Sequence, residues 1–238
     1  MSGHSKWANI KHKKAKEDDK RGRVFTRISK EILVAAREGG GDPAGNVRLR
    51  ILIEKGRAVN MPKDNIDRAI KKGIGELGGE HYESVSYEGY GPCGVAVIVE
   101  VLTENKNRTI SDVRHCFSKR GGAIGADGSV AWMFHHKGVV TFAAPGASED
   151  DLLEKFLDLD IDELILDDGM VTLECAMDQL DTVRSGAEKL GFKVESAELA
   201  WIPRTPAQLN EDQEKIVYDF LDAVSDVEDV QNVYANIE

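Results

Sequence analysis

Hydrophobic positions recur every three to four residues through the first third of the chain, a spacing typical of amphipathic helices. The longest such segment covers residues 24–38 and ends at three consecutive glycines. Asp42-Pro43 supplies a cap and a proline at the first position of the next helix, which extends to about residue 60. A third helix begins after Met61-Pro62 and ends with two lysines and a glycine. The pattern predicts a compact bundle of three short helices.

Residues 76–142 change to the two-residue alternation and β-branched composition of strands. Strands are predicted over 83–88, 95–102 and 129–134. A helix is expected between the second and the third of these, because Thr109-x-x-Asp112 resembles a capping box. Trp132 and Phe134 would share one face of the third strand, and we expect both to pack in the core.

Residues 136–202 follow the order strand, helix, strand, strand, helix, strand, which is that of the ferredoxin-like plait. A last helix over 211–225 and a strand over 229–237 cannot bury their apolar faces alone. The middle region lacks one helix and one strand of the same plait, so we expect the C-terminal piece to return and complete it. The predicted class is α+β, a helical domain followed by two ferredoxin-like domains, the last inserted into the middle one. The expected domains are a basic helical domain (1–75), a discontinuous α/β domain (76–135 and 206–238) and an acidic ferredoxin-like domain (136–205).

Charge separates these regions more sharply than composition does. Residues 1–75 hold 19 Lys and Arg against 9 Asp and Glu, whereas residues 76–238 hold 12 against 33. A field divided in this way attracts polyanions to one end of the chain and repels them from the rest. Nucleic acid is therefore the expected partner, and we expect it to meet the first third of the chain.

The predicted first helix has one apolar face and one cationic face. At about 100° per residue, four further cations cluster around Arg23, and Val34 interrupts their stripe. Lysines and arginines neutralise phosphates, so we expect this face and the basic leader before it to contact nucleic acid. Trp7 in the leader would either stack on a base or anchor the leader on the bundle. The predicted contacts of the helical domain are Lys6, Trp7, Lys11, Lys13, Lys14, Lys20, Arg21, Arg23, Arg27, Lys30, Arg48, Lys55, Arg57, Lys71 and Lys72.

A second basic cluster precedes the glycine-rich loop 121–128. Exposed amides of such a loop can approach a phosphate backbone closely. The alternative interpretation is an ordinary surface helix followed by a flexible hairpin. The cations of this cluster are Lys106, Arg108, Arg114, Lys119 and Arg120.

Patterns for catalysis, cofactors or metals fail on their context. Gly73–Gly78 and Gly89–Gly94 match the letters of the dinucleotide fingerprint, but neither joins a strand to a helix. Residues 158–162 begin like a calcium loop and lack its glycine and final glutamate. The three cysteines form no Cys-x-x-Cys pair, and no run of about 18 apolar residues or signal leader occurs. We expect a cytoplasmic protein with no enzymatic activity, cofactor, metal or membrane partner.

Five motifs occur in a characteristic order along the chain. They are Gly3-His-Ser-Lys-Trp7, Asn60-Met-Pro62, Tyr87-Glu-Gly-Tyr-Gly-Pro92, Asn107-Arg-Thr109, and Gly121-Gly followed by Gly128-Ser-Val130. Through these motifs the chain resembles the YebC/PmpR family over essentially its whole length. Cys93 departs from the glycine usual in the family's turn.

The resemblance implies a bacterial cytoplasmic protein with one helical and two α/β domains, and a regulator of transcription that binds DNA. The related mitochondrial translational activator of cytochrome c oxidase implies the alternative, a ribosome-associated activator of translation that binds ribosomal RNA. Both interpretations use the same basic face. A third keeps the acidic domain as a docking surface for a basic protein partner. The sequence does not predict the oligomeric state.

Overall fold

The computed structural model describes residues 18–77 and 82–237, without the side chains of residues 18–21 and 23. These residues form two compact units. One unit runs up to Ala131 and adds Ala207–Ala235, and the other holds Trp132–Pro206 with residues 236–237. None of the helices in the described ranges is long and apolar enough to cross a membrane.

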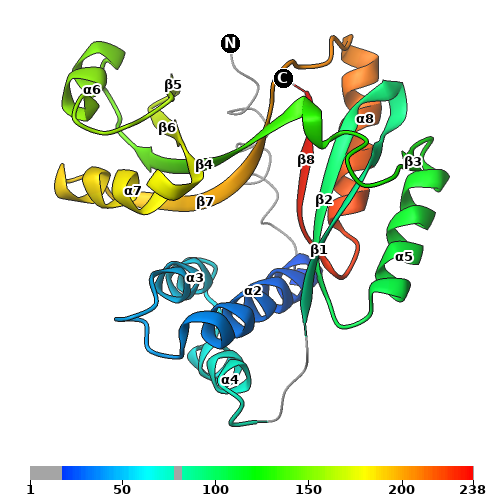
Figure 1. The fold of residues 1–238 in the computed structure, drawn as a ribbon, viewed down its shortest axis with the longest axis horizontal. Helices are drawn as coiled ribbons and strands as arrows, with labels where there is room; N and C mark the ends of the chain where they lie inside the picture. The colour runs from blue at the N-terminus through cyan, green and yellow to red at the C-terminus, as the bar shows by residue number, and fades with distance from the viewer. Residues whose placement is uncertain (1–17, 78–81, 238) are drawn as a thin grey trace. The chain divides into compact units, whose positions relative to one another are not determined.

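Three helices open the first unit: α2 (Asp18–Gly39), α3 (Val47–Ala58) and α4 (Lys63–Gly73) (Figure 1). Their common core contains buried side chains from each helix, among them Ile32, Leu49 and Ile66. Helices α2 and α4 approach very closely at Gly73, where an added Cβ would lie 2.4 Å from the carbonyl oxygen of Leu33. A glycine at this position is therefore what allows the two helices to pack at this distance.

The second helix begins later than its sequence predicts. Asp42 closes a turn in which its carbonyl accepts hydrogen bonds from the N–H groups of Gly45 and Asn46. Asn46 is the N-cap, with its side-chain oxygen accepting from the N–H of Leu49 at 3.0 Å. Pro43 therefore lies in the turn and not at the first position of the helix.

The first unit also contains a four-stranded antiparallel sheet in the order β3-β1-β2-β8. Its elements in chain order are β1 (Glu83–Tyr90), β2 (Ala96–Thr103), α5 (Lys106–Lys119), β3 (Ala123–Ile124), α8 (Glu211–Ser225) and β8 (Val230–Ala235). The turn from β1 to β2 holds Cys93 at φ 60°, a left-handed conformation that favours glycine. A glycine would adopt this conformation without strain.

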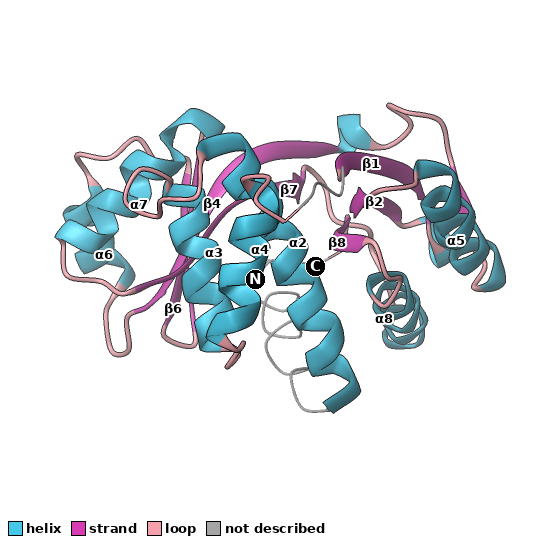
Figure 2. Cartoon of the chain, turned by 90° about the horizontal axis from the view of Figure 1, so that it is seen from below, coloured by secondary structure: helices cyan, strands magenta, loops and turns pink. Residues whose placement is uncertain are grey.

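The C-terminal segment completes this sheet, as the sequence predicts. Strand β8 pairs antiparallel with β2 from Val97 opposite Ala235 to Val101 opposite Val230. Helices α5 and α8 lie side by side against the sheet (Figures 1 and 2), and Phe117 meets Phe220 edge-to-face with ring centroids 4.9 Å apart. The inserted segment thus interrupts a middle domain whose last helix and strand come from the end of the chain.

The predicted third strand over 129–134 is wrong. The carboxylate of Glu88 accepts hydrogen bonds from the N–H groups of Gly128, Val130 and Ala131 at 2.7, 2.7 and 2.8 Å, so these groups are not available to a strand. Residues 131–133 form a short 3-10 turn instead, and β3 lies within the glycine-rich loop. Trp132 is 66% exposed and does not pack in a core, whereas Phe134 is buried as expected.

The helix after β2 also begins elsewhere than predicted. Asn105 is its N-cap, and the side-chain oxygen of Asn105 accepts from the N–H of Arg108 at 3.1 Å. Thr109 therefore lies inside the first turn of α5, where its side chain is buried.

The second unit is the predicted ferredoxin-like plait, with a four-stranded antiparallel sheet in the order β5-β6-β4-β7. Helices α6 and α7 contribute Phe156 and Val183 to one core with Phe142 and Leu173 of the sheet. Its elements are β4 (Phe134–Ala143), α6 (Glu149–Phe156), β5 (Glu163–Asp167), β6 (Met170–Cys175), α7 (Leu180–Lys189) and β7 (Val194–Pro203).

Candidate nucleic-acid interface

The sheet β3-β1-β2-β8 is called the middle sheet below. The central part of the cationic face of α2 is turned toward this sheet. Lys30 Nζ lies 2.8 Å from Oδ1 of Asp229, and the two side chains are only 9% and 3% exposed. Asp229 directly precedes β8, so this ion pair joins the middle of the bundle's longest helix to the C-terminal segment.

The carboxylate of Asp229 collects further donors. Its Oδ2 lies 2.8 Å from a guanidinium nitrogen of Arg108 and 3.1 and 2.6 Å from the hydroxyls of Thr103 and Thr109. Burial alone would raise the pKa of Asp229, but the hydrogen bonds from Lys30, Thr109 and Arg108 outweigh it and hold this pKa well below its usual range. Asp229 is therefore ionised throughout the physiological pH range.

Arg27 and Val34, one turn before and after Lys30 on α2, also contact the rest of this unit. Arg27 donates from its guanidinium to the carbonyl oxygen of Ser225 at 2.7 Å. Val34, which interrupts the cationic stripe, packs in a small buried cluster with Leu33 and Leu102. The stripe is thus in part a contact between helix and sheet. The expectation that Arg27 and Lys30 contact phosphates is corrected accordingly, because both are already bonded inside the protein.

Three other predicted cations have carboxylate partners nearer the surface, whereas the partner of Arg108 is the buried Asp229. The three pairs are Arg48 with Glu38 at 2.6 Å, Lys55 with Glu31 at 3.3 Å and Lys106 with Glu83. Exposed pairs of this kind are weak and screened by salt, so a phosphate can compete for these cations.

Several predicted cations are exposed and form no ion pair with a carboxylate of the described residues. Arg120 contacts the sulfur of Cys116 at 3.7 Å and is otherwise open to solvent. The exposed members are Arg57 and Lys71 in the bundle and Arg114, Lys119 and Arg120 at the end of α5.

Part of the predicted interface lies outside the described residues. The leader residues are Lys6, Trp7, Lys11, Lys13 and Lys14. Lys20, Arg21 and Arg23 lie within α2, but their side chains are not among those described. Their phosphate contacts stay predictions.

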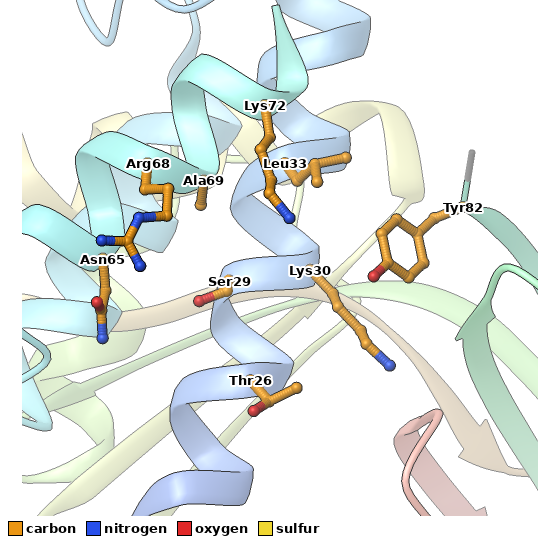
Figure 3. Close-up of a pocket in the computed structure, with 9 residues that line it drawn as sticks. All are labelled: Thr26, Ser29, Lys30, Leu33, Asn65, Arg68, Ala69, Lys72 and Tyr82. Atoms are coloured by element: carbon orange, nitrogen blue, oxygen red, sulfur yellow. The ribbon is translucent and has the colours of Figure 1, made fainter. Parts of the chain in front are cut away.

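A pocket of about 310 Å³ between α2, α4 and Tyr82 brings in residues that the sequence reasoning missed. Helix α4 lines it with Asn65, Arg68, Ala69 and Lys72, of which only Lys72 was a predicted contact. The signal was present in the sequence, because these positions follow the i, i+3, i+4, i+7 spacing of one helix face. Figure 3 shows the nine lining residues.

Acid is expected to weaken the contact between α2 and the middle sheet. The pKa of Asp229 is lower in the folded protein than its ordinary value of 3.8, so the folded state binds fewer protons. Its stabilising contribution is complete above that ordinary value and is lost as the pH falls below it. We expect the urea midpoint of the full chain to fall more steeply below about pH 4 than that of Asp229→Asn. Parallel pH profiles of the two proteins would contradict this assignment.

Two family models match the chain: the TACO1/YebC protein N-terminal domain over residues 5–76, and the TACO1/YebC second and third domain over residues 82–237. A "Probable transcriptional regulatory protein" of Nitrosomonas europaea is 51% identical over 99% of this chain and 98% of its own length. One of Pelotomaculum thermopropionicum with the same description is 47% identical over 100% and 99%. The crystal structure of a conserved hypothetical protein from Aquifex aeolicus superposes with a TM-score of 0.87, at 45% identity over 98% of this chain and 96% of that one.

Proposed function

The chain belongs to the TACO1/YebC family, and we propose that it regulates gene expression by binding nucleic acid through its helical region. The relatives' description as transcriptional regulatory proteins supports the regulatory role. In this proposal the protein binds the nucleic acid and carries out no reaction on it.

The separation of charge carries this proposal. A net charge of about +10 on residues 1–75 stands against −21 on the rest of the chain, counted from the residues given above. Arg57 and Lys71 lie exposed in the bundle and pair with no carboxylate of the described residues, which leaves them able to neutralise phosphates. The acidic remainder would keep the polyanion at the helical end.

Salt dependence tests the proposal directly. With a single-stranded or duplex oligonucleotide, the full chain is expected to bind with a slope of log K against log salt of about −3 or steeper. The double variant Arg57→Glu/Lys71→Glu should bind at least about tenfold more weakly at 0.1 M salt, because two attractive charges become repulsive. Fluorescence anisotropy measures both quantities.

The matched control is Lys189→Glu/Lys193→Glu, which reverses two exposed lysines in the acidic unit. It should leave the slope and the affinity near those of the natural protein. A flat salt dependence of the natural chain, or an equal loss in both double variants, would contradict the proposal.

One observation favours recognition by shape and charge and supports ribosomal RNA as the second candidate target. Phosphate contacts position a protein but carry no sequence information, and a base-reading helix must enter a groove. The central face of α2 is occupied by Asp229, Ser225 and Leu102, so this face cannot enter a major groove. Sedimentation with salt-washed ribosomes, compared with footprinting on promoter DNA, would separate the two targets.

A further inference from the structure

We propose that helix α6 of the second unit docks a basic amphipathic helix of a protein partner. The partner's apolar side chains would cover Leu153 and Leu157, and its lysines or arginines would meet the carboxylates beside these leucines. The proposal goes beyond the proposed function, because it concerns the acidic unit and a ligand other than nucleic acid.

Helix α6 carries two apolar rows, and the core of its own unit uses one of them. Leu152 and Phe156, four positions apart, are fully buried in this core. Leu153 and Leu157 repeat the spacing one position later and are 42% and 76% exposed. Leu157 keeps the backbone angles of a right-handed helix, so the two exposed leucines lie on one face, one turn apart. Single exposed leucines are common at protein surfaces, whereas a second row at helical spacing resembles the face that one helix presents to another.

Carboxylates border this exposed row. Asp150 and Glu154 stand three positions before Leu153 and Leu157, which makes them their neighbours on the helix surface. Asp158 follows directly in the chain, and all three acids are exposed and pair with no cation of the described residues.

The basic residue of α6 does not neutralise this border. The Nζ atom of Lys155 lies 5.6 Å from the centre of the Phe192 ring, and Phe192 packs against the core of the unit. The exposed leucines are therefore flanked by negative charge that α6 itself leaves unbalanced.

Two of these acids stand where a helix disfavours them. Ser148 caps the first turn by accepting a hydrogen bond from the N–H of Asp151 at 3.2 Å, and acids in that turn, such as Asp150, are favoured by the positive end of the helix dipole. Glu154 and Asp158 lie instead at the C-terminal end, where the dipole is negative. The helix gains no stability from carboxylates at this end, and a cation from another molecule is their natural complement.

Charge complementarity selects the occupant. The carboxylates repel a nucleic-acid strand, and a wholly apolar segment would leave them without a counter-charge. A helix with leucine-sized residues one turn apart and lysines or arginines beside them covers both rows at once. Residues 132–206 hold 16 Asp and Glu against 6 Lys and Arg, so the field of the whole unit attracts such a partner.

The experiment compares Leu153→Gln/Leu157→Gln with Met177→Gln/Leu190→Gln in the full chain. The control removes two apolar side chains of the same unit that are 48% and 45% exposed and lie outside α6. The probe is a short synthetic peptide of leucine and lysine in helical spacing, followed by fluorescence anisotropy. The α6 variant should bind this peptide roughly tenfold or more weakly than the natural chain, because both apolar contacts are lost. The control should bind like the natural chain.

A second pair of variants tests the carboxylates and does not depend on the leucines. Glu154→Gln/Asp158→Asn should weaken peptide binding by roughly tenfold at 0.1 M salt. The same change should leave the urea midpoint equal or higher, because it removes unfavourable charge from the end of the helix. Asp178→Asn/Glu195→Gln removes two exposed acids elsewhere in the unit and should leave binding unchanged. Acids that serve only to stabilise the fold would not combine weaker binding with undiminished stability.

Four outcomes would overturn the docking surface. They are a natural chain that binds no leucine-lysine peptide, equal binding by the leucine variant and its control, equal binding of a serine-lysine peptide of the same charge, and a loss of oligonucleotide binding in the leucine variant. The last of these would place nucleic acid at α6. The first three leave the proposed function standing, because oligonucleotide binding by the natural chain is measured separately.

Discussion

Replacing Asp229 by asparagine is expected to lower the free energy of unfolding by about 3–5 kcal/mol, because the substitution leaves the ammonium group of Lys30 buried without its counter-charge. The side chains of the pair are only 9% and 3% exposed, so water cannot take the place of the lost partner. The hydroxyls of Thr103 and Thr109 would also lose their charged acceptor. Urea denaturation of the full chain, followed by circular dichroism, measures the change.

The matched control is Glu38→Gln, which breaks an ion pair of similar length at the surface. Arg48 and Glu38 lie 2.6 Å apart, but their side chains are 60% and 61% exposed. This change should cost less than about 1 kcal/mol. Equal losses in the two variants would contradict the view that Asp229 anchors α2. The double variant Lys30→Met/Asp229→Leu should recover much of the loss, since it removes both buried charges together.

The second large effect is expected at Phe220, where alanine should cost about 3–5 kcal/mol. This ring is buried, meets Phe117 edge-to-face, and lies where added Cβ atoms at Gly91 and Gly122 would touch it. It therefore joins α8 from the end of the chain to α5 and to the turns beside β1. Its removal leaves a cavity at the point where the returning segment meets the middle sheet.

Ile216 provides the control on the same helix, because its side chain is 52% exposed. Ile216→Ala should change the free energy of unfolding by less than about 1 kcal/mol. A Phe220→Ala variant as stable as Ile216→Ala would mean that α8 contributes little to the middle domain. Urea titration of both variants at neutral pH gives the comparison.

Periodic segments of the fold could be predicted from the sequence, and their ends depend on local chemistry. Helical spacing predicts α8 over residues 211–225, with the ends that the structure has. The pattern fails where a side chain takes over backbone groups. Glu88 binds three N–H groups near residue 130 and prevents a strand. Asn46 and Asn105 are the N-caps of α3 and α5, whereas the sequence predicts that these helices begin at Pro43 and Thr109.

The sequence predicts that the candidate site lies in the basic helical region, but it predicts only some of the residues that form it. Cations spaced along α2 look alike in the sequence, but the partner of Lys30 lies 199 positions away, so no local pattern can reveal that this lysine is buried. Arg68 does not stand out in the sequence, because Asp67 and Ala69 flank it. Only the fold places it opposite α2, in the lining of the pocket. The boundaries between domains stay predictions at residues 75, 135 and 205.

The pairing of β2 with β8 also bears on how the chain is made. Some 130 residues separate the two strands, and the whole inserted domain lies between them. During synthesis, β2 must emerge with an open edge and wait until β8 has been translated. The inserted domain, whose strands all lie within Phe134–Pro203, can fold in that interval. Any chain that stops before β8 carries an unpaired apolar strand, which is a template for aggregation.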